Sequence, residues 1–184
     1  VFGEHNLQNL KAAQLVCQTI GIDDPSFYGA IKTFKGASKR LELVCKNDRF
    51  SFYKDFAHSP SKLKATTKAL KKQFKNRALI ACMELHTFSS LNKEFLQEYN
   101  QSMVDADEAY IYFNRATIKH KKLDDISEED VLSSFGTKNI TVITSSEDLL
   151  QIILEKNWEN QNLLMMSSGN FDGVDFNELG SKII

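Results

Sequence analysis

Residues 49–83 read RFSFYKDFAHSPSKLKATTKALKKQFKNRALIACM and pass from a strand pattern to a helix pattern and back again. The run 49–56 alternates apolar and polar side chains, which is typical of a strand with one covered face. The run 60–74 begins with a proline and repeats its apolar residues at helical spacing. The short run 78–83 is continuously apolar, as in a strand covered on both faces. This order of elements predicts the α/β class.

The same rhythm continues to the end of the chain. Further strands are predicted at 110–113, 140–144 and 163–166, and further helices at 92–103, 127–135, 146–157 and 174–184. Residues 41–46 also alternate, and Asn47-Asp48 is a turn signal before the run 49–56, so a hairpin opens the domain. We expect a Rossmann-like open mixed sheet of about six strands, with an antiparallel hairpin, then parallel strands, and helices on both faces.

The first part of the chain predicts a separate helical appendage. Residues 6–20 form a helical pattern, and Asp24-Pro25 opens a second short helix. Gly36-Ala37-Ser38 then breaks the pattern. We therefore expect 1–35 and 36–184 to be different structural units. Because the sequence begins at Val1 without a methionine, it reads as a piece of a longer protein.

The composition is that of an ordinary globular chain, and it argues against nucleic-acid and membrane partners. The 23 basic and 24 acidic residues leave a net charge of -1, and no apolar run is long enough to cross a bilayer. The lysines of 62–75 carry no interleaved aromatic residues and predict a solvated face. Cys17, Cys45 and Cys82 form no CxxC pair, which favours buried free thiols in the cytoplasm over a metal site.

Polar segments that follow strands are the candidate binding regions, because open α/β sheets bind ligands at the carboxyl ends of their strands. These segments are 55–60, 84–90 and 167–173. Neither the glycine fingerprint of dinucleotide sites nor the glycine-rich phosphate loop occurs in the sequence. The absence of the first disfavours a nicotinamide enzyme. The absence of the second means that any triphosphate must be held in another way.

Several side chains near these segments suit a nucleotide, although each also has a purely structural interpretation. Asp55 can accept hydrogen bonds from a ribose diol, or else Asp55 or Ser59 caps the helix that follows. His5 and Asn9 can reach a base or a sugar. On the structural interpretation, Asn6 caps the first helix. Lys39 and Arg40 suit a phosphate, or else they are a solvated pair.

The segment 84–90 contains the most informative single residue, His86. Its hydroxyl-rich neighbours and Glu84 favour a surface cleft over a core histidine. In 167–173, glycine and serine permit close approach of the backbone to a ligand. The structural interpretation of 167–173 is a tight connection into the last helix.

Three motifs, in order and over nearly the whole chain, resemble the Mur ligases, which build peptidoglycan precursors. Residues 3–9 look like the end of their central ATPase domain. Residues 34–42, FKGASKRLE, resemble the F-x-G-x-x-R-R-x-E opening of their third domain. Residues 55–60, DFAHSP, match D-Y-A-H-x-P with phenylalanine for tyrosine.

Two further segments point toward one member of that family. Residues 84–89, ELHTFS, resemble both the E-P-R-S-N-T loop of the tripeptide-recycling murein peptide ligases and the P-H-x-[FY]-S loop of the L-alanine-adding ligases. Residues 167–173, SSGNFDG, follow Met166 and resemble the M-S-N-G-G-F-G-G run of the recycling ligases. The resemblance therefore favours the recycling type, with leucine and histidine at 85 and 86 where that type has proline and arginine.

The resemblance implies an ATP-dependent ligase that works through an acyl phosphate. ATP would phosphorylate the carboxylate of UDP-N-acetylmuramate. The amine of L-Ala-γ-D-Glu-meso-diaminopimelate would then attack the acyl phosphate, and ADP and phosphate would leave. An N-terminal domain would hold the UDP-sugar, a central domain would hold ATP and Mg²⁺, and the C-terminal domain would close over both. This chain would be the last helices of the central domain (1–35) and the C-terminal domain (36–184). It would be inactive alone, with no catalytic or metal-binding residue of its own.

The resemblance also assigns individual residues. The implied ATP-binding residues are His5, Asn6, Asn9, Arg40, Asp55 and His58, and the implied peptide-binding residues are Glu84, His86, Thr87, Ser89, Ser168 and Asn170. Two alternatives stay open: the same domain of an L-alanine-adding ligase, and a binding module for a nucleotide or peptide without catalysis. A phosphate loop upstream of residue 1 would favour the ligase.

Overall fold

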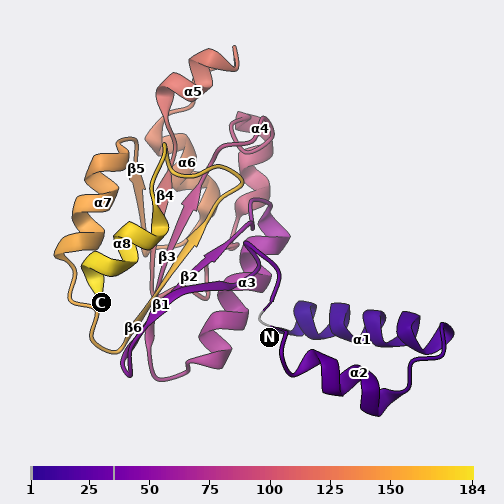
Figure 1. Ribbon diagram of the computed structural model, residues 1–184. Coiled ribbons are helices and arrows are strands. Elements are labelled where there is room, and N and C mark those ends of the chain that lie inside the picture. The colour runs from indigo at the N-terminus through magenta and orange to yellow at the C-terminus, as the bar shows by residue number, and fades with distance from the viewer. Residues whose placement is uncertain (1, 35) are drawn as a thin grey trace.

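A computed structural model describes residues 2–34 and 36–184, and it contains a six-stranded sheet with helices on both faces (Figure 1). The strands are β1 (Glu42–Lys46), β2 (Phe50–Asp55), β3 (Ala78–Glu84), β4 (Glu108–Tyr112), β5 (Ile140–Ile143) and β6 (Gln161–Met166). Their order is β1-β2-β6-β3-β4-β5, in which β1 and β2 are antiparallel and the other neighbours are parallel. The predicted fold class is therefore confirmed.

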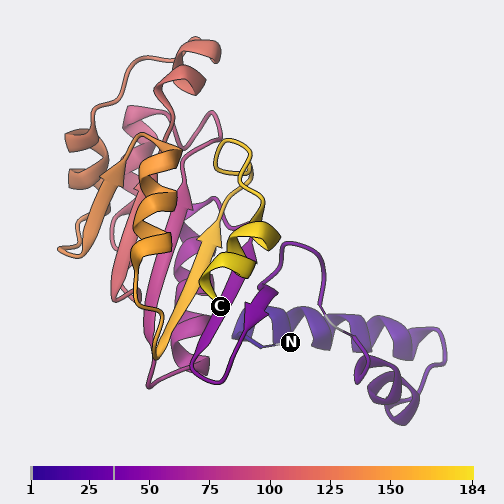
Figure 2. The same cartoon turned by 60° about the vertical axis from the view of Figure 1, so that its left-hand side comes forward.

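Each face of the sheet has its own hydrophobic core. One face is covered by α3 (Pro60–Gln73), α4 (Lys93–Leu96) and α6 (Glu128–Phe135), and the other by α7 (Ser146–Glu155) and α8 (Phe176–Ile183). Figure 2 shows α7 and α8 in front of the sheet and α3 behind it. The central strands β3, β4 and β6 are buried on both sides, which explains their largely apolar sequence.

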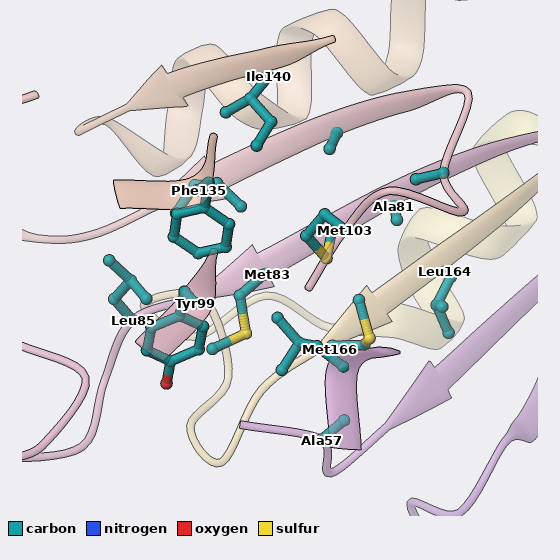
Figure 3. Close-up of a cluster of buried hydrophobic side chains, with 14 of the residues drawn as sticks. Ala57, Ala81, Met83, Leu85, Tyr99, Met103, Phe135, Ile140, Leu164 and Met166 are labelled. Carbon is teal, nitrogen blue, oxygen red and sulfur yellow. The ribbon is translucent and has the colours of Figure 1, made fainter. Parts of the chain in front are cut away.

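An aromatic pair lies at the centre of the first core. The ring of Tyr99 stacks on the ring of Phe135 at 5.1 Å between centroids, and both side chains are fully buried. Figure 3 shows this pair beside Met83 and Leu85, at the end of β3. The Tyr99 hydroxyl donates to the carbonyl of His58 at 2.6 Å. The core thus fixes the turn after β2, where the first candidate segment lies.

The first helices form a hairpin beside this domain. Helix α1 (Glu4–Thr19) and helix α2 (Asp24–Ile31) are joined by the Asp24 carboxylate, which accepts from Gln14 at 2.6 Å and from Gln18 at 2.8 Å. The Phe2 ring packs at 5.7 Å from that of Tyr53. Figure 1 shows the hairpin extending away from the sheet. Its outer surface exposes Leu7, Leu15, Val16, Ile20, Ile22, Tyr28 and Phe34.

Some expected elements differ in extent. The helix expected over 92–103 is replaced by α4 and a short 3₁₀ turn, η1 (Gln97–Tyr99). A helix outside the expected ranges, α5 (Arg115–His120), is capped by the Asn114 side chain, which accepts from the amide of Ala116 at 2.7 Å. Of the cysteines expected to be buried, only Cys82 is fully so, although all three are free.

None of the helices in the described ranges is both long and apolar enough to span a membrane.

Two caps also differ from expectation. Helix α1 starts after Gly3, so Asn6 lies within the helix, where its side chain donates to the carbonyl of Phe2 at 3.0 Å. Helix α3 has Ser59 at its cap position, but neither Ser59 nor Asp55 makes a capping side-chain bond to the helix. Helix α6 begins with a capping box, in which the side chains of Ser127 and Asp130 each accept from the other's backbone amide.

Candidate functional site

The three candidate segments meet at one edge of the sheet. Asp55 is level with Met166, the last residue of β6, and Glu84 is level with Tyr112 at the end of β4. The strands β2, β6, β3 and β4 are neighbours, so their carboxyl ends form one continuous edge. The three polar segments therefore lie at the edge where open α/β sheets bind ligands.

Glu84 joins the loops that follow β3 and β6. Its side chain is 3% exposed, and its Oε2 accepts from the Phe171 amide at 2.9 Å and from the Ser167 hydroxyl. A buried carboxylate needs such donors, because an unpaired charge in the interior is costly. We call residues 84–90 and 167–173 the loop pair. Their mutual placement is set by this carboxylate.

His86 lies on the surface of the loop pair. Its Nδ1 is 3.5 Å from Oε1 of Glu84, and its side chain is 38% exposed. The expectation of a surface histidine, rather than a core one, is confirmed. An imidazole in this position can donate to an anionic group on a ligand.

The other polar residues of the loop pair mostly stabilise the loops. The Thr87 hydroxyl hydrogen-bonds to the hydroxyls of Ser89 and Ser90, and the Ser90 hydroxyl also donates to the Thr87 carbonyl at 3.1 Å. Asn170 is exposed, and its carbonyl oxygen accepts from the Val174 amide at 2.9 Å, closing the turn. Among the described residues, the buried hydroxyl oxygen of Ser168 has no hydrogen-bond partner.

A second anchor of the loop pair involves residues that the sequence patterns did not single out. The carboxylate of Asp172 accepts hydrogen bonds from the Tyr112 hydroxyl and the Asn114 amide. Burial raises the pKa of Tyr112, and the neighbouring Asp172 raises it further, so the phenol stays a donor. The one feature of the sequence that could have indicated this contact is the position of its residues. Tyr112 and Asn114 lie at the end of a strand, and Asp172 lies in a glycine-containing loop.

Asp55 is the centre of a different arrangement. Its Oδ2 accepts from the Leu41 amide and its Oδ1 from the Ala57 amide, both at 2.7 Å. The side chain therefore ties the segment that opens the domain to the end of β2. Leu41 and Lys39 have φ angles of 43° and 53°, in the left-handed region that non-glycine residues rarely adopt. Asp55 thus holds an unusual backbone segment in place.

Charges near Asp55 come from separate parts of the chain. Burial raises the pKa of Asp55 above its ordinary value. The Leu41 and Ala57 amides and the positive charges of Arg40 and His5 act in the opposite direction but are outweighed. Arg40 is exposed in the opening segment, and His5 is half-buried at the start of α1. His58 follows in the β2 loop, with Nδ1 2.8 Å from the Phe56 carbonyl oxygen. We call His5, Arg40, Asp55 and His58 the nucleotide-side cluster.

The remaining implied ATP residues are less central. Asn9 is exposed on α1, and the Asn6 amide is used within α1. Among residues 2–34 and 36–184, no group of three or more histidine, cysteine or acidic side chains is arranged to hold a metal ion. The groups at this edge are an imidazole and a guanidinium, which donate hydrogen bonds, and a carboxylate, which accepts them, and together they suit the phosphates and hydroxyls of a nucleotide.

Comparison with known proteins places this site in a family. The model of the family described as "Mur ligase, glutamate ligase domain" matches residues 39–169. The UDP-N-acetylmuramate–L-alanine ligase of Desulfitobacterium hafniense is 31% identical over 152 residues, which cover 81% of this chain and 33% of that protein. This chain therefore spans about a third of the length of that relative.

Two solved structures have the same fold. The UDP-N-acetylmuramate–alanine ligase of Thermotoga maritima matches with a TM-score of 0.74 and 19% identity, over all of this chain and 37% of that one. The murein peptide ligase of Psychrobacter arcticus matches with a TM-score of 0.64 and 23% identity, over 99% of this chain and 38% of that one. With the family match over 39–169, these findings establish that the chain belongs to the Mur ligase family, as its glutamate ligase domain.

Proposed function

We propose that this chain is the substrate-side part of an ATP-dependent ligase that joins UDP-N-acetylmuramate to L-Ala-γ-D-Glu-meso-diaminopimelate in peptidoglycan recycling. The family consists of such ATP-dependent amide-forming enzymes, and the chain corresponds to their C-terminal domain. Residues 1–35 lie outside the matched range 39–169, in line with their assignment to the preceding domain. The proposed location is the cytoplasm, where the three free cysteines would stay reduced.

One observation supports the tripeptide as the incoming amine. The segments that resemble the recycling ligases, 84–89 and 167–173, bond to each other through Glu84, which occupies the glutamate position of the E-P-R-S-N-T loop. Serine and phenylalanine of the second segment, Ser167 and Phe171, supply the donors. The two resemblances therefore describe one structural unit rather than two separate similarities.

Each side of the sheet edge has a proposed role. His86 would donate to a carboxylate of the peptide, and the polar rim formed by Thr87, Ser89, Ser168 and Asn170 would contact its backbone. On the nucleotide side, Arg40 would approach the phosphates of ATP, and the lone pairs that Asp55 keeps beside its two amide bonds would accept the ribose hydroxyls. Mg²⁺ would neutralise phosphate charge, held mainly by the preceding domain.

A second candidate, the L-alanine-adding ligase, is favoured by a different observation. Residues 85–89, LHTFS, match the P-H-x-[FY]-S loop at histidine, phenylalanine and serine. The Desulfitobacterium hafniense relative and the Thermotoga maritima structure also carry that activity in their names. The two candidates share the nucleotide, the sugar and the mechanism, and they differ in the incoming amine.

Substrate competition in the full-length protein tests the proposal. The protein is incubated with ATP, Mg²⁺ and UDP-N-acetylmuramate, and phosphate release is measured with the tripeptide or with L-alanine. We expect kcat/KM to favour the tripeptide by about 100-fold or more, because free L-alanine lacks the D-glutamate and diaminopimelate residues whose carboxylates His86 would bind. A preference for L-alanine would assign the second candidate. Phosphate release with neither amine would contradict both.

A further inference from the structure

The buried carboxylate of Glu84 is an unusual feature of the loop pair. The residue is 2% exposed, so a ligand at the surface cannot contact it directly. One oxygen is committed to Ser167 and Phe171, and the other faces the His86 ring. Although a binding role for Glu84 was expected, its hydrogen bonds go to the β6 loop, and its Oε1 lies beside the partly exposed imidazole of His86.

Gly169 completes the enclosure of that ring. A Cβ atom at this position would lie 2.8 Å from Oε2 of Glu84 and 3.0 Å from Cγ of His86, closer than real Cβ atoms normally approach. Gly169 does not have a positive φ, so its conformation is open to other residues. Glycine is therefore required here for space. The missing side chain lets the β6 loop close directly on the imidazole.

From these contacts we infer that Glu84 and Gly169 are positioning residues for His86. The carboxylate lies 3.5 Å from Nδ1 of the imidazole, and Gly169 lies so close to the ring that an added Cβ would be 3.0 Å from Cγ and 3.1 Å from Nδ1. The opposite edge of the ring, which carries Nε2, is left to face the ligand. Neither residue touches the substrate, and each acts through the direction in which His86 presents its donor. This inference rests on the proposed function, in which His86 meets the incoming amine substrate.

A double-mutant cycle in the full-length ligase tests the coupling. Glu84→Gln keeps the size of the side chain and an oxygen acceptor for Phe171, but it removes the charge beside His86. We expect the KM for the amine substrate to rise about 5- to 20-fold, with the KM for ATP unchanged. In a His86→Ala background, Glu84→Gln should add no further rise. An equal rise in both constants, or the same rise with and without His86, would overturn the inference.

Glycine variants provide a steric test with a matched control. Gly169→Ala should displace the His86 ring in a crystal structure and raise the KM for the amine substrate. Gly180 in α8 is similarly crowded, with Cys45 Sγ 3.1 Å from the site of an added Cβ, but it lies against β1. Gly180→Ala should lower stability and leave that KM unchanged. An unmoved His86 ring in Gly169→Ala would overturn the inference. If the wild-type protein ligates no amine, the proposed function fails, and the ring position still decides the positioning claim.

Discussion

The nucleotide-side cluster and the loop pair lie at the same sheet edge but are built differently. The cluster takes its members from α1, from the segment that opens the domain, and from the end of β2 with the loop after it, and each oxygen of Asp55 accepts from a backbone amide. The loop pair comes from loops after the neighbouring strands β3 and β6, and Glu84 holds them within one domain. The loop pair is thus formed by the domain alone, whereas the cluster depends on how the opening segment runs.

This difference predicts how each site responds to change. Disturbing the opening segment should affect nucleotide use and stability together, because the same carboxylate serves both. Disturbing the loop pair should affect the amine substrate with little loss of stability, provided that Glu84 stays in place.

The largest effect is expected for Asp55→Ala. The substitution leaves the Leu41 and Ala57 amides without their acceptor, beside residues with left-handed backbone. We expect the free energy of unfolding to fall by about 2–4 kcal/mol, as measured by denaturant titration. Asp125→Ala is the control, since that side chain is 75% exposed and should matter by less than about 0.5 kcal/mol. A loss for Asp55→Ala as small as that for Asp125→Ala would show that the Asp55 hydrogen bonds to the Leu41 and Ala57 amides contribute nothing to stability.

His86→Ala should most clearly separate amine binding at the loop pair from ATP binding at the nucleotide-side cluster. The side chain is partly exposed and makes few contacts, so the melting temperature should change little. The KM for the amine substrate should rise about 10-fold in the full-length enzyme, and the KM for ATP should stay near its original value. A large melting loss with equal damage to both constants would mean that His86 is structural.

Tyr112→Phe should have a smaller and more local effect. The variant removes the hydroxyl that donates to Asp172 while the ring keeps its packing against Phe171. We expect a loss of about 1 kcal/mol in stability and faster amide exchange in 171–173. Unchanged exchange in that segment would show that the Asn114 amide anchors the loop without Tyr112.

The pH dependence of stability should differ in sign between two carboxyls. Burial raises the pKa of Asp55 above its ordinary value of 3.8, so its contribution is present below that pH and is lost as the pH rises through the raised pKa. The Lys93 ammonium and the Ser127 cap lower the pKa of Asp130 to about 2, so its contribution is present above 3.8 and is lost as the pH falls toward 2.

Denaturant titrations of Asp55→Asn and Asp130→Asn against the wild type, from about pH 2 to about pH 7, measure these two contributions. Relative to the wild type, Asp55→Asn should become less unfavourable as the pH rises and Asp130→Asn more unfavourable. The same slope for both variants would contradict the difference in environment.

Most of the fold follows from local patterns in the sequence. The apolar run 78–83 and the alternating run 49–56 predict β3 and β2, because burial on two faces or one face sets the period directly. The helix expected over 92–103 breaks into α4 and η1, because Tyr99 is held by stacking on Phe135 and by its bond to His58. Those contacts span 36 and 41 positions in the chain, and no local pattern encodes them.

The sequence predicted which segments form the candidate site, but it did not predict the hydrogen bonds that join them. The rule that ligands bind at the carboxyl ends of strands located 84–90 and 167–173 correctly at one edge. It did not show that Glu84 is buried between them, since a glutamate in a polar loop reads as a surface residue. It also missed the Tyr112–Asp172 bond, whose partners are 60 residues apart. The energetic roles of these side chains depend on the pairing of β3, β4 and β6.

Amide hydrogen exchange of the full-length protein tests the division between the two sides most directly. Exchange is followed without ligand, with a non-hydrolysable ATP analogue, and with the analogue plus the tripeptide. The nucleotide alone should protect 36–41 and 56–59, and the tripeptide should add protection in 84–90 and 167–173. Protection of the loop pair by the nucleotide alone, or no added protection with the tripeptide, would contradict the assignment of the loop pair to the incoming amine.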